Sequence, residues 1–141
     1  MSVPSVNINF VAVLVGAAVQ MAIGMLWYSP ILFGNLWMRL MGFTDKDVTK
    51  AKKKEMIKSY IIMFISILVM TFLVAFFVSK IGVVDFVDGG IVGFQIWIGF
   101  IATTMLGSVL WEGKSWKLYL INTGHYLVVL IVSGAILGHW R

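Results

Sequence analysis

Four long stretches of this chain contain no Asp, Glu, Lys or Arg. They run over residues 2–38, 59–79, 89–111 and 118–140. A helix needs about 20 apolar residues to cross about 30 Å of hydrocarbon, and each stretch reaches that length. Their apolar residues are continuous rather than alternating, which favours helices over the strands of an outer-membrane barrel. We therefore predict an all-α polytopic membrane protein, a single domain over residues 1–141. Its four transmembrane helices are expected near 6–28, 59–79, 88–111 and 118–139.

A different pattern follows the first span. Ser29 and Pro30 are typical of the cap and first position of a new helix. Apolar residues then recur at helical spacing at Phe33, Leu36, Trp37, Leu40 and Met41. This pattern predicts a short amphipathic helix over 30–41 that lies in the membrane interface.

A basic loop over 42–58 is expected between this interfacial helix and the second span. Thr44 and Asp47 have the spacing of a helix capping box. No helix-breaking residue follows until Gly82. We therefore predict a helix that begins near Asp45 and continues into the second span.

Composition narrows the class of protein further. Hydrophobic residues make up 60% of the 141 residues and charged residues 12%, and there is no cysteine. Ordinary soluble domains have about 45–50% and about 25% respectively. This balance excludes a soluble enzyme, a disordered tail and a disulfide-stabilised secreted domain. An integral membrane protein remains.

The basic residues are distributed unevenly between the two sides of the membrane. Nine of the eleven lie between the first two spans or between the last two: Arg39, Lys46, Lys50, Lys52, Lys53, Lys54, Lys58, Lys114 and Lys117. The positive-inside rule places such segments in the cytoplasm. We therefore expect a cytoplasmic-membrane protein with segments 29–58 and 112–117 in the cytoplasm and both termini outside.

Part of this basic segment is also a candidate lipid-binding surface. The lysine run comprises Lys50, Lys52, Lys53, Lys54 and Lys58. Lysines beside a span attract anionic lipid headgroups by about 1 kcal/mol each. The run is equally explained as a determinant of topology, and it indicates membrane lipids rather than nucleic acid as the partner.

The absence of charge inside the spans excludes several mechanisms. A proton-coupled exporter of the small four-helix type needs a carboxylate within the membrane, and a voltage sensor needs buried basic residues. The chain has neither, and without cysteine it has no thiol chemistry. His125 and His139 are fourteen residues apart on one helix, about 21 Å, so they do not form a metal site together. We expect no cofactor and no metal.

The polar residues that remain within the spans are the candidate functional residues. They are Gln20, Gln95, Thr103, Asn122 and His125, and each lies on a stripe with small residues. Small residues allow helices to approach closely, so we expect these stripes to be buried. In the third span the stripe is Gln95, Gly99, Thr103 and Gly107. The second span is nearly all apolar and is expected to face lipid.

Three of these residues are expected to meet. Gln20 and His125 both lie about 12 Å inside the inner boundary of the membrane, and Asn122 is one turn from His125. They form either a substrate or ion pathway, or a hydrogen-bonded packing contact between helices. The glycine-containing faces also suggest a homo-oligomer.

A motif after the first helix carries a resemblance to a known family. Residues Trp27, Tyr28, Ser29, Pro30, Phe33, Gly34 and Trp37 form the pattern WYSP-x-x-FG-x-x-W, which we call the interfacial elbow. It resembles the hallmark of an uncharacterised bacterial four-helix membrane protein family, a domain of unknown function. Residues 118–124, LYLINTG, are similar to the second recurring feature of that family. The resemblance implies an architecture but no substrate and no catalytic residues.

Three functions are compatible with these observations. The leading hypothesis is a transporter or channel for a small solute, with an uncharged polar pathway through the five candidate residues. The alternative is a non-transporting lipid-binding or scaffold protein that uses the interfacial elbow and the lysine run. The third is a membrane enzyme that uses His125, the one intramembrane acid–base group, although no nucleophile or carboxylate partner is evident.

The predicted orientation is testable with reporter fusions. Alkaline phosphatase, which is active only outside the cytoplasm, should be active when fused after the last residue and inactive when fused at Lys52. The positive-inside bias is the physical reason. Activity at Lys52 together with inactivity at the C-terminus would contradict the orientation.

Overall fold

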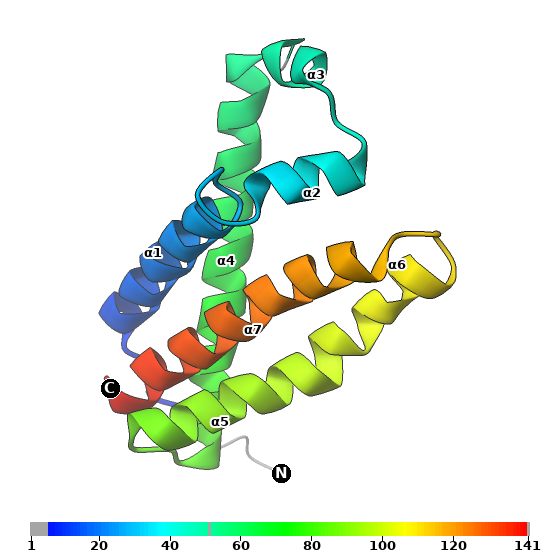
Figure 1. Cartoon of the computed structure of the whole chain (residues 1–141). Helices are drawn as coiled ribbons and strands as arrows, with labels where there is room; N and C mark the ends of the chain where they lie inside the picture. The colour runs from blue at the N-terminus through cyan, green and yellow to red at the C-terminus, as the bar shows by residue number, and fades with distance from the viewer. Residues whose placement is uncertain (1–5, 51, 141) are drawn as a thin grey trace.

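The computed structural model describes residues 6–50 and 52–140, and nearly all of these form helices joined by short turns (Figure 1). Four helical segments are long and apolar enough to cross a membrane. They are α1 (Phe10–Trp27), α4 (Lys53–Ile81), a third span over Phe86–Leu110 and α7 (Trp116–His139). The described residues contain no strand. The predicted all-α fold with four spans is confirmed. Arg141, one of the two basic residues outside the segments predicted to be cytoplasmic, lies outside the described residues.

Two short helices, α2 (Gly34–Met41) and α3 (Asp45–Lys50), join α1 to α4. The capping box of α3 has formed: the backbone N–H and the hydroxyl of Thr44 donate to Asp47 Oδ2 at 2.8 and 2.9 Å. These hydrogen bonds stabilise the carboxylate and hold the pKa of Asp47 below its usual value.

The prediction of one continuous helix from Asp45 into the second span is wrong. α3 ends at Lys50, Lys52 has extended backbone angles, and α4 begins at Lys53. A continuous helix would place Lys50 one turn from both Lys53 and Lys54 on the same face. Like charges at that spacing repel each other, which favours a break. α4 still begins six residues before the predicted span.

The third span is not one regular α-helix. It consists of α5 (Phe86–Ile96), a π-helical segment η1 (Trp97–Ala102), a 3-10 turn η2 (Thr104–Leu106) and α6 (Gly107–Leu110). The hydroxyl of Thr103 donates back to the Gly99 carbonyl at 2.7 Å, and that of Thr104 donates to the Phe100 carbonyl. Such back-bonding competes with the regular helical ladder and bends helices.

Two side-chain hydrogen bonds join the irregular part of the third span to α7. The hydroxyl of Tyr119 donates to the Ala102 carbonyl at 2.6 Å, and the indole N–H of Trp97 donates to the Thr123 carbonyl at 2.7 Å. In hydrocarbon an unpaired carbonyl has no water to bind, so the Tyr119 bond gives a carbonyl of the π-helical segment a partner. The Trp97 bond attaches the same segment to the backbone of α7.

α5 and α7 pack backbone against backbone through glycines. A Cβ atom on Gly93 would collide with the carbonyl oxygen of Leu130, and one on Gly134 would collide with that of Gly89. Gly138 also lies against Gly89. Glycines four residues apart on both helices give the small-residue packing that is common between helices in membranes. The tight turn at 111–115 makes the two helices antiparallel neighbours.

The Gln95, Gly99, Thr103 and Gly107 stripe is not buried within a single copy of the chain, and its burial between copies stays a prediction. Gln95, Gly99 and Thr103 are exposed, and a Cβ atom on Gly99 would have nothing within 4 Å. Gln95 follows Gly93 by two residues, about 200° around the helix. The face with Gly93 packs on α7, so the face with Gln95 necessarily points away from it.

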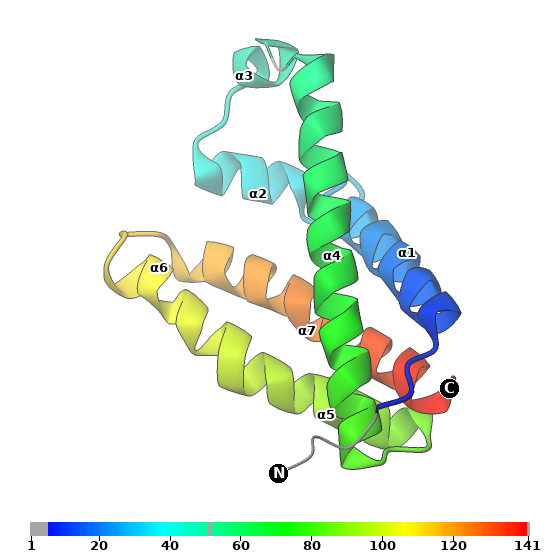
Figure 2. The same ribbon diagram turned by 180° about the vertical axis from the view of Figure 1, so that it is seen from behind.

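α1 packs against both α4 and α7, and their shared core lies toward the end that holds the α4–α5 turn. Ala12, Val13, Val74, Val78 and Leu130 are buried there. α4 extends well beyond this core: seen from behind, its first turns rise past α1 toward α3 (Figure 2). The apolar part of α4 is the least buried of the four spans, at 22%. This agrees with the expectation that the second span largely faces lipid.

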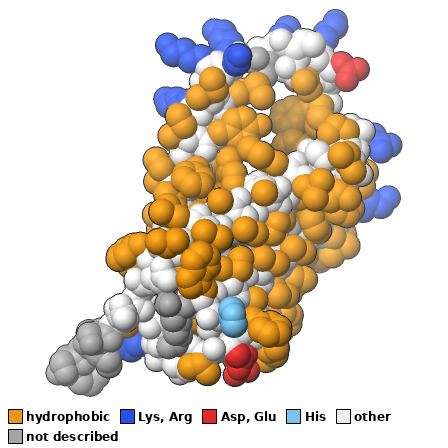
Figure 3. Space-filling model, turned by 90° about the vertical axis from the view of Figure 1, so that its left-hand side faces the viewer, with side chains coloured by type: hydrophobic (Ala, Val, Ile, Leu, Met, Phe, Trp, Pro, Cys, Tyr) orange, Lys and Arg blue, Asp and Glu red, His pale blue; other side chains and the backbone are white. Residues whose placement is uncertain are grey.

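Charged side chains gather at the two ends of the molecule. In Figure 3 an apolar surface covers the middle, and most Lys and Arg side chains lie beyond it at the end that carries α3. Both ends of the described chain lie at the opposite end (Figure 1). This separation supports the predicted orientation, which stays a prediction.

The glycine packing of α5 on α7 predicts a selective loss of stability. Gly93→Ala should destabilise the protein by about 1–3 kcal/mol, because the added methyl group meets the backbone of α7 and overpacks the contact. Gly99→Ala, in the same span, is the matched control and should change stability by less than about 0.5 kcal/mol. Denaturation in detergent measures both. Equal effects of the two substitutions would contradict this packing.

Candidate functional site

The interfacial elbow is a compact turn between α1 and α2. The N–H of Phe33 donates to the Trp27 carbonyl at 3.0 Å, and that of Gly34 donates to the Ser29 carbonyl at 2.9 Å. A Cβ atom on Gly34 would overlap the carbonyl groups of Tyr28 and Ser29, so only glycine fits there. The close approach explains the Phe-Gly pair of the motif.

The predicted start of the interfacial helix is corrected by this turn. α2 begins at Gly34 rather than Pro30, and residues 28–33 form turns. Ser29 does not cap α2, because its hydroxyl donates backward to the Leu26 carbonyl at 2.6 Å. The carbonyl of Ser29 instead accepts the backbone N–H groups that close the turn.

Aromatic side chains of the elbow attach it to α7. The indole N–H of Trp27 donates to the Ile121 carbonyl at 3.0 Å, and the hydroxyl of Tyr28 donates to Asn122 Oδ1 at 2.9 Å. The Trp37 ring packs edge-on against Tyr28, with ring centroids 5.7 Å apart. These contacts hold α2 over the beginning of α7.

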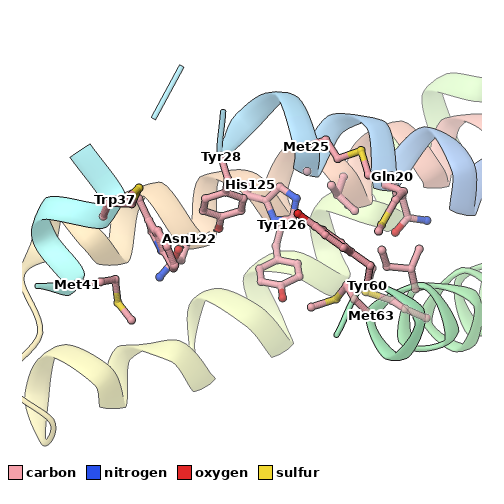
Figure 4. Close-up of a pocket in the computed structure, with 16 residues that line it drawn as sticks. Gln20, Met25, Tyr28, Trp37, Met41, Tyr60, Met63, Asn122, His125 and Tyr126 are labelled. Atoms are coloured by element: carbon pink, nitrogen blue, oxygen red, sulfur yellow. Dashed lines mark hydrogen bonds between the residues drawn. The ribbon is translucent and has the colours of Figure 1, made fainter. Parts of the chain in front are cut away.

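A cavity of about 640 Å³ lies between α1, α2, α4 and α7 beneath the elbow (Figure 4). Its sixteen lining residues are Gln20, Met21, Gly24, Met25, Tyr28, Trp37, Met38, Met41, Tyr60, Met63, Ile67, Met70, Asn122, His125, Tyr126 and Val129. Met25, Tyr60 and Met63 are at least half exposed, so the cavity opens at the surface of the chain. Toward the other end, the core of α1, α4 and α7 closes it.

Six of the nine methionines of the chain line this cavity. Methionine side chains are unbranched, flexible and polarisable, so they adapt to ligands of different shapes. Aromatic rings contribute much of the remaining wall. A wall of this composition favours an apolar ligand, with a few polar atoms available to orient it.

Gln20 is the most buried polar residue of the wall, at 2% exposed. Its side-chain N–H donates to the hydroxyl of Thr71, which itself donates to the Ile67 carbonyl at 2.7 Å. The other amide atom, Oε1, is buried and has no hydrogen-bond partner. Gln20 therefore lines the cavity and holds an unsatisfied acceptor that is buried within the wall.

His125 lies in an aromatic surround on the same side of the cavity. Its ring is 5.2 Å from that of Tyr28 and 5.0 Å from that of Tyr126, centroid to centroid. Nε2 faces Gly24, where a Cβ atom would be 3.3 Å away, and it is also buried without a partner. Figure 4 shows His125 and Gln20 along the α1 side of the cavity.

The five residues of the predicted pathway separate into two groups. Gln20, Asn122 and His125 line the cavity together, although they come from α1 and α7. Gln95 and Thr103 are exposed on the third span and do not line the cavity. A single copy of the chain therefore does not form a continuous polar pathway through all five.

Sequence reasoning missed the contribution of α4. Tyr60, Met63, Ile67 and Met70 line the cavity and follow one face of this helix at spacings of three and four. Thr71 orients Gln20 from the same helix. The spacing was visible in the sequence, but in an apolar span it does not distinguish a cavity wall from a lipid-facing surface.

The lysine run lies outside the cavity, and all five of its side chains are exposed. Lys53 precedes Tyr60 by seven residues, which places both on the same face of α4 two turns apart. Among residues 6–50 and 52–140, no three His, Asp or Glu side chains lie together as ligands for a metal ion.

The fold is that of a polytopic helical membrane protein, and a cavity lies between α1, α2, α4 and α7. The profile of the family described as "Protein of unknown function (DUF1761)" matches residues 11–138, and the chain belongs to this family. No curated protein and no solved structure matches the chain.

The elbow geometry predicts a strict requirement for glycine at position 34. Gly34→Ala should destabilise the protein by about 1–3 kcal/mol, because the methyl group would overlap the backbone at Tyr28 and Ser29. Asn35→Ala, at the exposed neighbouring position, is the control and should change stability by less than about 0.5 kcal/mol. Thermal denaturation in detergent compares them. An unchanged melting temperature for Gly34→Ala would show that the elbow is not built this way.

Proposed function

We propose that this protein binds a small amphiphile within the membrane, in the cavity between α1, α2, α4 and α7. The volume of about 640 Å³ is in the range of ligand sites, which extends from about 300 to 1,000 Å³. The single observation that carries the proposal is the pair of unpartnered buried atoms, Gln20 Oε1 and His125 Nε2, in an otherwise methionine-rich and aromatic wall.

A ligand that forms hydrogen bonds with these two atoms would stabilise the protein. A buried polar atom without a hydrogen bond destabilises a protein by about 1–3 kcal/mol. In the membrane core, water is not available to satisfy it. A ligand with an apolar body and a small polar group would fill the cavity and supply the missing hydrogen bond.

The mouth of the cavity indicates a lateral route of entry. Its exposed residues Met25, Tyr60 and Met63 lie on α1 and α4, and Lys53 lies two turns above Tyr60 on the same face of α4. With the predicted orientation, the mouth opens in the cytoplasmic leaflet and the lysine run lies among the headgroups.

Transport of the same ligand is a second candidate. The cavity is open on one side and closed on the other by the buried core around Val13, Val74 and Leu130, which is the geometry of one end state in an alternating-access cycle. A channel through Gln95 and Thr103 would require a second copy of the chain against the third span. Movement of the bound amphiphile to the opposite leaflet of a liposome would distinguish transport from binding alone.

Binding is testable with a brominated amphiphile, because bromine quenches the fluorescence of nearby tryptophans such as Trp37. The purified protein in lipid nanodiscs should show saturable quenching by 12-bromo-1-dodecanol. Met63→Phe combined with Met70→Phe should weaken the apparent affinity at least tenfold, because rigid rings replace two of the flexible side chains that adapt to the ligand.

The matched control is Ile62→Phe combined with Val69→Phe, which has the same spacing on an exposed face of α4. This control should bind like the unmodified protein. Quenching that never saturates, or equal affinities for the two double variants, would contradict a binding site in the cavity.

A further inference from the structure

We infer that the ligand carries a neutral hydroxyl group that donates a hydrogen bond to Gln20 Oε1. The cavity would then select alcohols and phenols over ethers, esters and ketones of the same shape. This inference rests on the proposed binding function and specifies the chemistry of the ligand.

The site offers a hydrogen-bond acceptor, and this follows from three connected groups: the Gln20 amide, the Thr71 hydroxyl and the Ile67 carbonyl. The hydroxyl of Thr71 has one proton, and it donates this proton to the Ile67 carbonyl at 2.7 Å. Thr71 can therefore only accept from Gln20, which fixes the amide nitrogen on the Thr71 side. The amide oxygen is left free, and an amide oxygen accepts hydrogen bonds but never donates them.

Hydrogen bonding favours this arrangement over the reversed amide. Gln20 is 2% exposed and Thr71 is 0% exposed, so neither side chain has water as a partner. Rotation of the amide by 180° would require the Thr71 hydroxyl to leave the Ile67 carbonyl and donate to the amide oxygen. One hydrogen bond would then replace two, and both amide N–H groups would be left without partners in a medium without water. The arrangement with the amide oxygen free therefore makes one more hydrogen bond than the reversed one.

His125 does not alter this requirement. Its Nε2 atom faces Gly24, one helical turn or about 6 Å along α1 from Gln20. A neutral imidazole nitrogen donates or accepts according to its tautomer, so His125 accommodates either kind of polar group. A hydroxyl that donates to Gln20 still has lone pairs with which to accept a second bond.

The absence of charged residues in the cavity favours a hydroxyl over an ammonium group as the hydrogen-bond donor. None of its sixteen lining residues is Asp, Glu, Lys or Arg. An ammonium group would therefore enter without a counter-charge, and burial of an unpaired charge is strongly unfavourable. A hydroxyl brings a donor without that penalty. Gln20 Oε1 is buried, so a ligand reaches it after neighbouring side chains move, and the methionines that line the cavity are flexible.

A pair of probes tests the inference: in one the phenolic oxygen carries a hydrogen, and in the other it carries a methyl group. 4-Octylphenol donates a hydrogen bond, and 4-octylanisole, its methyl ether, does not. We expect the phenol to bind about tenfold more tightly after correction for partition of each probe into protein-free nanodiscs, because the ether leaves Gln20 Oε1 unpaired. Displacement of the brominated alcohol measures both affinities.

Two substitutions test whether Gln20 causes the preference for the phenol, and a third serves as the control. Gln20→Leu removes the acceptor, so the preference for the phenol should fall to within about twofold of equal binding. Thr71→Val removes the group that orients the amide, so Gln20 becomes free to present its N–H and ether binding should improve relative to phenol binding. Ser66→Ala removes an exposed hydroxyl from the same helix and should keep the preference of the unmodified protein.

The outcomes separate this inference from the proposed function. Saturable binding of both probes with equal affinity, or tighter binding of the ether, would overturn the hydroxyl requirement while leaving a binding site in place. Absence of saturable binding by either probe would overturn the proposed function as well. A preference for the phenol that survives in Gln20→Leu would also overturn the assignment to Gln20. The comparison of the two probes on the unmodified protein needs no variant to fold.

Discussion

Hydrocarbon offers no hydrogen-bond partner to a polar atom, and this constraint explains most of the internal contacts of the chain. The indole groups of Trp27 and Trp97 both donate to backbone carbonyls of α7. The hydroxyls of Thr103 and Ser133 donate to carbonyls one turn earlier in their own helices. Where polar groups occur within the spans, they mostly find such partners inside the chain.

The same constraint makes the exceptions informative. In the described part of the chain, two buried side-chain atoms have no partner, Gln20 Oε1 and His125 Nε2, and both residues line one cavity. The cavity exists because of how the helices meet. Glycines bring α5 and α7 into backbone contact at one end, whereas the beginning of α4 rises past α1 without a neighbouring span over its apolar face (Figures 1 and 2). The elbow then places α2 over the opening.

The sequence predicted the parts of this structure that depend on length and depth. Each span is long and uncharged, so the four helices could be placed within a few residues. Gln20 and His125 were expected at the same depth because each lies about eight residues from the same membrane boundary. The Thr44–Asp47 cap was also predictable, because its chemistry is local.

The remaining features depend on which helix face meets which neighbour. A span that is apolar all round has no hydrophobic periodicity to show its buried face. The third span has two small-residue stripes, and only contact with α7 shows that the one with Gly93 is buried and the one with Gly99 is exposed. Methionines were not recognised as a cavity wall for the same reason. In a membrane span an apolar residue such as Met63 is equally compatible with a cavity wall and with a lipid-facing surface, so the sequence pattern is the same for both. The break before Lys53 depends on repulsion among neighbouring lysines, which a search for Gly or Pro does not detect.

The central claim is that the cavity is a ligand site whose polar end is defined by Gln20. An experimental map of the protein in native lipid tests this claim most directly. We expect non-protein density in the cavity, with an oxygen atom within hydrogen-bond distance of Gln20 Oε1. A cavity closed by α4 packed against α2 and α7, with Gln20 Oε1 bonded within the protein, would contradict it.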